Sequence, residues 1–203
     1  GTPSVQLLPI PREEKITSLV AVDSFDNDCF LLMLTKAGFI KRTALSAFSK
    51  IRSNGLIAIN LEDGDALTWV RLSKEGDSVL IGSRTGMAIH FRLDINELRP
   101  LGRTARGVKS MNLREGDNLV SMDVLTSDLV DQLSSVEGLT KEIDENLEIN
   151  SSDGPWVLIA SSLGLGKRVP VTQFRLQRRA GMGLRAIKSV SYTHLRAHET
   201  SRY

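Results

Sequence analysis

Short apolar runs recur along the chain, and polar turns that contain glycine separate them. Residues 31–34 and 157–160 are unbroken apolar runs of strand length, which is typical of strands buried on both faces. Residues 87–93 alternate between apolar and more polar side chains, which indicates a strand with one apolar face. Gly38 stands between two strand-like stretches and fits a hairpin turn that requires a positive φ. The pattern therefore predicts an all-β chain of short strands.

The same order of features occurs three times. A glycine that follows a basic stretch marks each occurrence, at Gly55, Gly107 and Gly183. The first two glycines are 52 residues apart and the last two are 76 residues apart. The excess of 24 residues is close to the length of an acidic segment at residues 126–153, so we interpret that segment as an insertion. A repeat of this length is typical of roughly four-stranded blades that bury their apolar faces against their neighbours.

The chain is close to neutral overall, but its charges are segregated. Its 203 residues include 26 Lys and Arg and 24 Asp and Glu, for a formal net charge of +2. Residues 126–153 contain eight acids and one base, whereas residues 154–188 contain seven bases and no acid. Residues 31–61 contain five bases and no acid. Such blocks can be ordinary solvated faces, but their recurrence at similar places in a repeat favours a nucleic-acid partner.

Several function classes find no support in the sequence. The chain has no apolar run of about 18 residues and no signal-peptide pattern in residues 1–12, so we expect no membrane partner. The single cysteine, Cys29, cannot form an internal disulfide, which is consistent with a reducing compartment. No Cys/His cluster has zinc spacing, and His90 is expected to be structural or merely exposed rather than a catalytic base. We therefore predict no metal site and no catalytic residue.

Five segments of the chain are similar, in this order, to the C-terminal domain of the DNA gyrase A subunit: Gly1–Ile10, Thr43–Phe48, Arg52–Ile59, Gly102–Gly107 and Gly164–Pro170. The resemblance covers about residues 1–188. It implies a six-bladed β-pinwheel, a propeller-like disc whose blades exchange strands and whose basic rim binds and wraps DNA. This chain would then be an incomplete pinwheel of about three blades, namely the third, fourth and fifth.

The resemblance also sets the expected unit boundaries. We expect the end of a preceding blade at residues 1–12, blade units at 13–61, 62–113 and 114–188 (the last with the acidic insertion 126–153), and a tail at 189–203 that resembles translated adaptor sequence. The family's hallmark box, Gln-Arg-Arg-Gly-Gly-Lys-Gly, resembles residues 177–183, where Ala180 and Met182 replace a glycine and the lysine. Because that segment lies in the third unit and not in the first blade, we interpret it as a diverged copy of the same turn.

The expected DNA-binding surface consists of the basic residues that recur in each unit. DNA phosphates attract Lys and Arg through Coulomb forces and counterion release, with little need for base contacts. If blades stack radially, equivalent positions fall on one rim, and a curved basic rim suits a bent duplex. The predicted DNA-binding residues are Lys41, Arg42, Lys50, Arg52, Arg99, Arg103, Arg106, Lys109, Lys167, Arg168, Arg175, Arg178, Arg179 and Arg185. The neighbouring glycines Gly55, Gly107, Gly181 and Gly183 either admit phosphates to the backbone N–H groups or serve turn geometry alone.

The resemblance implies a function and partners for the intact enzyme. The chain would bind and wrap duplex DNA without sequence preference, as part of a type II DNA topoisomerase that introduces negative supercoils with ATP hydrolysis. Its partners would be a second gyrase A subunit together with the gyrase B subunit, in an A2B2 complex. ATP would belong to the B subunit, and Mg²⁺ would serve the cleavage site, so no cofactor is expected in this chain. The family's catalytic tyrosine has no counterpart here, since Tyr192 and Tyr203 both lie in the tail. The expected location is a bacterial cytoplasm, with a plastid or mitochondrion as the alternative.

Two other functions are compatible with the sequence. The equivalent domain of a topoisomerase IV A subunit has a degenerate box and fewer blades. A propeller-like scaffold for protein interactions would have no affinity for DNA. The acidic insertion is either a solvated loop or an internal DNA mimic that competes for the basic rim.

Overall fold

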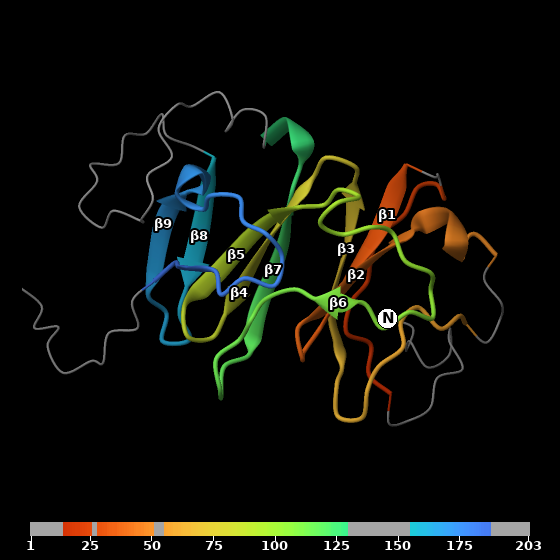
Figure 1. The fold of residues 1–203 in the computed structure, drawn as a ribbon, viewed down its shortest axis with the longest axis horizontal. Coiled ribbons are helices and arrows are strands. Elements are labelled where there is room, and N and C mark those ends of the chain that lie inside the picture. Colours follow the sequence, from red (N-terminus) through yellow and green to blue (C-terminus); the bar gives the residue numbers. More distant parts are fainter. Residues whose placement is uncertain (1–13, 26–27, 51–54, 130–154, 188–203) are drawn as a thin grey trace, which may run out of the picture.

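The computed structural model describes residues 14–25, 28–50, 55–129 and 155–187, which form three antiparallel sheets that follow one another across the molecule in chain order (Figure 1). The first sheet has the order β3 (Leu67–Lys74), β1 (Cys29–Thr35), β2 (Phe39–Ala44) and β6 (Val108–Lys109). The second has the order β10 (Leu184–Arg185), β5 (Met87–Arg92), β4 (Ser78–Ser83) and β7 (Leu119–Leu125). In the third, β8 (Trp156–Ala160) pairs with β9 (Gly166–Pro170). Two short 3-10 helices, η1 (Leu45–Phe48) and η2 (Val171–Gln173), follow β2 and β9.

The predicted all-β architecture of roughly four-stranded units is therefore confirmed. No helix among the described residues is long and apolar enough to cross a membrane. The segment 1–12, the tail 189–203 and all but the first four residues of the acidic insertion lie outside the described residues.

Each sheet contains one hairpin whose turn is closed by a glycine. Gly38, Gly86 and Gly164 have φ values of +89°, +84° and +84°, the left-handed region that favours glycine. In each turn the glycine N–H donates to the carbonyl three residues earlier, at 3.0–3.1 Å. The hairpin predicted at Gly38 is confirmed, and the same turn recurs at the other two positions.

The short strands β6 and β10 join the first and second sheets to the units that follow them in the chain. β6 pairs with β2 through Phe39 and Lys109, and β10 pairs with β5 through Ala88 and Leu184. The first and second sheets are thus each completed by a strand from the next predicted unit. β3 also lies beyond the predicted boundary at residue 61, so the sheets do not coincide with the predicted units.

The core lies between the sheets, and β5 shows why it is continuous. Ile89 and Phe91 are fully buried against the first sheet, among Leu32, Leu34 and their neighbours. Ala88, on the opposite face of β5, packs against side chains of the third sheet. Full burial of an Ile or Phe side chain contributes about 1.5–3 kcal/mol, so apolar contact between successive sheets is a large stabilising term. The alternating side chains of residues 87–93 therefore point to two faces of β5, and both faces are buried. Neither face is solvated.

His90 is part of this second buried face. It is 3% exposed, its Nδ1 lies 2.6 Å from the Phe174 carbonyl oxygen and its Nε2 lies 2.7 Å from Ser78 Oγ. A carbonyl can only accept, so Nδ1–H donates to Phe174 and Nε2 accepts from the Ser78 hydroxyl. Burial lowers the pKa of His90, which favours the neutral ring. The sequence expectation of a structural histidine is met, and its partners place it at the junction of two sheets.

Gly107 and Gly183 allow the joining strands to approach. A Cβ at Gly107 would lie 2.6 Å from the Ile40 carbonyl oxygen, and one at Gly183 would lie 2.5 Å from the Ala88 carbonyl oxygen. Both glycines also have positive φ, at +101° and +78°. These two glycines therefore serve backbone packing at the start of β6 and β10, the geometric alternative that the sequence left open.

Replacing Gly107 with alanine should destabilise the protein more than replacing Gly64, which matches it in backbone conformation. Gly64 has a φ of +82° but nothing within 4 Å of its added Cβ, so Gly64→Ala costs only the left-handed backbone, about 1–2 kcal/mol. Gly107→Ala adds a clash with strand β2, which we expect to cost a further 1–3 kcal/mol or so. Urea unfolding of the two variants measures the difference. Equal losses would contradict the close packing of Gly107 on Ile40.

His90 should make the protein sensitive to mild acid. Because the folded-state pKa is lowered below the ordinary value of 6.5, the unfolded chain binds more protons than the folded chain just below that pH. Stability should therefore fall as pH drops below 6.5, by at most about 1.4 kcal/mol per pH unit from this group. The unfolding free energies of the wild type and His90→Gln, compared across this range, isolate the effect. A constant difference between the two proteins would show that His90 does not titrate on unfolding.

Candidate nucleic-acid interface

Exposed cations occupy equivalent positions on the first and second sheets. Arg99 and Arg175 each lie eight residues before the glycine that opens the joining strand, and Lys109 and Arg185 each lie two residues after it. All four side chains are exposed. Because β6 and β10 pair with β2 and β5 in the same antiparallel manner, these cations are presented at equivalent places on neighbouring sheets.

Arg178 adds a fifth exposed cation between Arg175 and Arg185. None of these five residues forms an ion pair with another described residue. The Lys109 ammonium has a long hydrogen bond of 3.4 Å to Asn112 Oδ1. The five residues Arg99, Lys109, Arg175, Arg178 and Arg185 are called the exposed cation set below.

Arg103 and Arg106 lie in the same loop as Arg99 but are only partly exposed. The Arg106 guanidinium pairs with the Glu62 carboxylate and stacks 4.0 Å from the centre of the Phe39 ring. Arg103 donates weakly to the Ile57 carbonyl, at 3.5 Å. Both side chains therefore have protein partners that a phosphate would have to replace or share.

Lys41 and Arg42 are not on the surface. Both have 0% relative exposure, and Arg42 donates from Nη1 to the Leu93 carbonyl at 2.7 Å and to the Glu75 carboxylate at 2.8 Å. Its Nε donates to the Leu98 carbonyl. Neither side chain can reach a phosphate in this structure, so we no longer count Lys41 and Arg42 among the candidate DNA-contacting residues. The sequence prediction missed this because the covering loop comes more than fifty residues later in the chain.

The Lys41 ammonium is enclosed by the loop that carries Arg103 and Arg106. Its Nζ donates to the carbonyls of Gly102 and Ala105, each at 3.0 Å, and to that of Arg103. Burial, with a smaller contribution from the charge of Arg103, lowers the pKa of Lys41 to about 8.

The neighbouring arginines of the diverged box have different environments. Arg178 is exposed, whereas Arg179 is partly buried between the loops of the second and third units. The Arg179 side chain donates from Nε to the Glu97 carbonyl at 2.9 Å and from Nη1 to the Lys109 carbonyl at 2.7 Å. Its backbone N–H also donates to the Glu97 carboxylate at 2.9 Å. Arg179 therefore connects two loops, and Arg178 is the member of the pair that is available to a ligand.

The remaining predicted residues are separated from this group. Arg168 is exposed on β9 and stacks 4.2 Å from the centre of the Trp156 ring, while Lys167 is partly buried. Lys50 is exposed after η1, and Arg52 lies outside the described residues. These four stay predictions that the positions alone do not decide.

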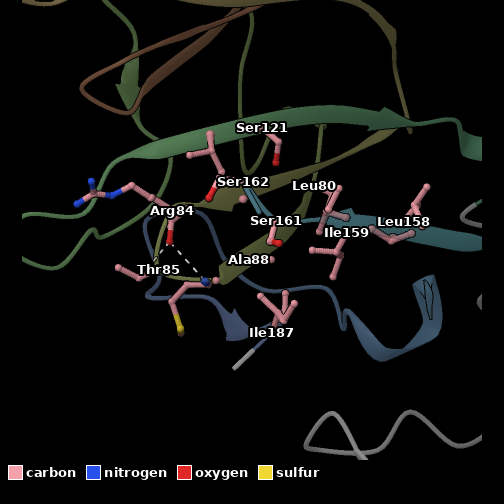
Figure 2. A pocket seen from close by; sticks show the side chains of 18 of the residues that line it. Leu80, Arg84, Thr85, Ala88, Ser121, Leu158, Ile159, Ser161, Ser162 and Ile187 are labelled. Carbon is pink, nitrogen blue, oxygen red and sulfur yellow. Dashed lines mark hydrogen bonds between the residues drawn. The ribbon is translucent and has the colours of Figure 1, made fainter. Parts of the chain in front are cut away.

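A cavity of about 600 Å³ lies between β8 and the β4–β5 hairpin (Figure 2). Its wall includes the apolar side chains of Leu80, Leu158 and Ile159, and Arg84 is the only charged residue among the described residues that line it. It therefore holds no pair of groups suited to acid–base or nucleophilic chemistry. Across the part of the chain that the structure describes, no group of three His, Cys, Asp or Glu side chains could hold a metal ion.

Comparisons with known proteins match most of the chain to one family. A family model described as the DNA gyrase C-terminal domain, β-propeller, matches residues 30–74, 77–126 and 155–191. The chain is 58% identical over 194 residues to the DNA gyrase A subunit of Synechocystis sp., covering 93% of this chain and 23% of that protein. It is 41% identical to the chloroplastic/mitochondrial DNA gyrase A subunit of Nicotiana benthamiana, covering 86% of this chain and 18% of that protein. The chain thus spans less than a quarter of the length of these relatives.

Two solved structures share the fold. The C-terminal domain of DNA topoisomerase IV matches with a TM-score of 0.72 and 26% identity, covering 95% of this chain and 52% of that one. The DNA gyrase A C-terminal domain matches with a TM-score of 0.67 and 25% identity, covering 90% of this chain and 51% of that one. With three matched segments that together make up more than half of its length, the chain belongs to the DNA gyrase C-terminal domain β-propeller family.

Proposed function

We propose that this chain binds duplex DNA without sequence preference and wraps it as part of a gyrase, a type II topoisomerase that introduces negative supercoils with ATP hydrolysis. The observation that carries the proposal is the repetition of Arg99 and Lys109 on one sheet as Arg175 and Arg185 on the next. Membership of the gyrase C-terminal family and the similarity to DNA gyrase A subunits support it.

The physical basis is the attraction of a repeated cation pattern for a bent polyanion. Each phosphate neutralised by Lys or Arg releases condensed counterions. It adds about 0.9 to the magnitude of the negative slope of log K against log salt, which is called the salt slope below. Bending a site of about 20–30 base pairs costs on the order of 1–6 kcal/mol, which further backbone contacts must offset. Equivalent cations on successive sheets supply such contacts at successive points along a curved path.

The rest of the proposed enzyme lies outside this chain. Partners would be the gyrase B subunit, which would bind ATP, and a second A subunit in an A2B2 complex, with Mg²⁺ at the cleavage site. The location would be a bacterial cytoplasm, or alternatively a plastid or mitochondrion. A relative from Synechocystis sp. and one named chloroplastic/mitochondrial support these two alternatives. A second candidate is the corresponding domain of topoisomerase IV, favoured by the TM-score of 0.72 to that domain.

The wrapping proposal predicts a change in DNA topology. Incubating the protein with nicked plasmid, sealing the nick and removing the protein should leave a shifted linking number, because wrapped DNA is trapped by ligation. The shift should grow with protein concentration and vanish at high salt. An unchanged linking number at concentrations where the protein is bound would remove wrapping. Absence of salt-dependent binding would favour the protein-interaction scaffold instead.

Arg178 and Arg179 should differ although they are adjacent. Arg178→Ala should lower the salt slope of DNA binding by about 0.9 and leave stability unchanged, because this side chain is exposed. Arg179→Ala should lower stability by about 1–3 kcal/mol, because it leaves the Glu97 and Lys109 carbonyls without their donor. Salt titrations of binding to a random duplex and urea unfolding test both effects. A reversed pattern would mean that the two side chains have exchanged roles.

A further inference from the structure

The loop between Arg99 and Lys109 contributes cations to the proposed DNA surface but has few bonds of its own. Within it, the Ala105 N–H donates to the Gly102 carbonyl at 3.2 Å, and the Ala105 carbonyl accepts from Asn60 N–H at 3.4 Å. These are long bonds for a segment whose shape determines where Arg99, Arg103 and Arg106 lie. Something else must hold the loop.

Strand β2 of the preceding sheet supplies that support. The backbone of Gly107 packs on the Ile40 carbonyl, and the Arg42 carbonyl accepts from Leu101 N–H at 2.8 Å. These two contacts fix both ends of the segment 101–107. Between them, the side chain of Lys41 reaches the centre of the loop.

The number of donors in this contact equals the number of acceptors. Three loop carbonyls, from Gly102, Arg103 and Ala105, converge on Nζ, and an ammonium group has three donors and no acceptor. A charged donor makes hydrogen bonds of roughly twice the strength of neutral ones. The buried ammonium therefore holds three carbonyl dipoles that would otherwise repel one another and turn apart.

The second sheet holds its loop in another way. The residue equivalent to Lys41, three positions after the hairpin glycine, is Ile89, which is buried in the apolar core. There Arg179 of the loop donates to the carbonyls of Glu97 and Lys109, which ties this loop to the end of the first one. The third sheet has a lysine at the same position, Lys167, but it is only partly buried. Of the two hairpins that a described joining strand covers, only the first therefore has a lysine beneath its loop.

We propose that Lys41 is a positioning residue for DNA binding, which fixes the loop 99–109 so that Arg99 and Lys109 face the duplex, without itself touching DNA. This inference rests on the proposed DNA-binding function for one of its readouts. The other readout, the order of the loop, is independent of DNA. The charge of Arg103 lies close enough to lower the pKa of Lys41, so removing the charge at position 41 also changes the field that Arg103 experiences.

The test compares Lys41→Gln with Lys41→Arg and with Lys36→Gln in the full chain. Glutamine at position 41 is neutral, whereas arginine keeps the charge and the donors. Lys36 is an exposed lysine on the same hairpin and controls for the loss of one surface charge. Binding to a random-sequence linear duplex is measured against salt, and amide hydrogen exchange reports the order of residues 101–107.

Lys41→Gln should weaken binding on the order of tenfold and lower the salt slope by about 1.8 or more, since at least two phosphate contacts lose their position. Amides of the loop should exchange faster. Lys41→Arg, which keeps the charge but presents a larger planar group to the three carbonyls, should restore both readouts in part. Lys36→Gln should change the slope by at most about 0.9. If Lys41→Gln binds with wild-type affinity and slope, the inference is overturned. A wild type that does not bind DNA would overturn the proposed function, and faster exchange in Lys41→Gln would then show only that Lys41 orders the loop. Unchanged exchange in Lys41→Gln would overturn the inference whether or not the wild type binds DNA.

A pH series on the wild type gives a readout that does not require the glutamine variant to fold. As pH rises through about 8, Lys41 loses its proton, and wild-type affinity should fall relative to that of Lys41→Arg, which stays charged. The comparison cancels the titration of every other group, including Lys109 on the neighbouring strand. Parallel pH profiles for the two proteins would contradict the inference.

Discussion

The contact on which this structure depends is the pairing of a short strand from one unit with the second strand of the preceding sheet. It is made twice with the same geometry. Ser110 N–H donates to the Gly38 carbonyl and Ala186 N–H donates to the Gly86 carbonyl, each at 2.8 Å, and a glycine without room for a Cβ precedes each strand. The pairing brings the loop before each joining strand over the preceding hairpin. The placement of the cations in that loop follows from this backbone contact, because the loop has no sheet of its own.

The same contact divides the basic residues into two groups with different roles. A cation that a later segment covers is desolvated and finds backbone carbonyls as partners, since a buried charge is very costly when unpaired. Lys41 is covered by the loop itself and Arg42 by the segment just before it, at Leu93 and Leu98. A cation on the outer side of the loop, such as Arg99 or Arg175, remains in solvent and is free to bind a polyanion. Residue type and net charge are equal in the two groups. Position relative to the covering loop decides the role.

Much of the fold was predictable from local signals, and the candidate site only partly so. The apolar runs and the glycine at position 38 predicted strands and a hairpin because their information lies within a few residues. The burial of Lys41 depends on carbonyls that are 61 to 64 residues away in the sequence, which no local pattern encodes. One sequence signal could have predicted the burial of Lys41 and Arg42. Aligning the units places Lys41 and Arg42 opposite Ile89 and His90, and an apolar residue at an equivalent strand position indicates a buried position.

The third sheet shows how a strand pair looks when no following unit covers it among the described residues. Leu32, Leu80 and Leu158 stand opposite Arg42, His90 and Arg168 in the three strand registers. The first two leucines are 0% and 9% exposed beneath the following unit, whereas Leu158 is 77% exposed. Arg42 and Arg168 both stack on an aromatic ring of the adjoining strand, so the local geometry of the arginine is the same whether or not it is covered. The exposure of Arg168 therefore reflects which segments surround β9 in this structure. Unlike the exposure of Arg99 and Arg175, which persists beside neighbouring units, it does not by itself indicate a ligand-binding role.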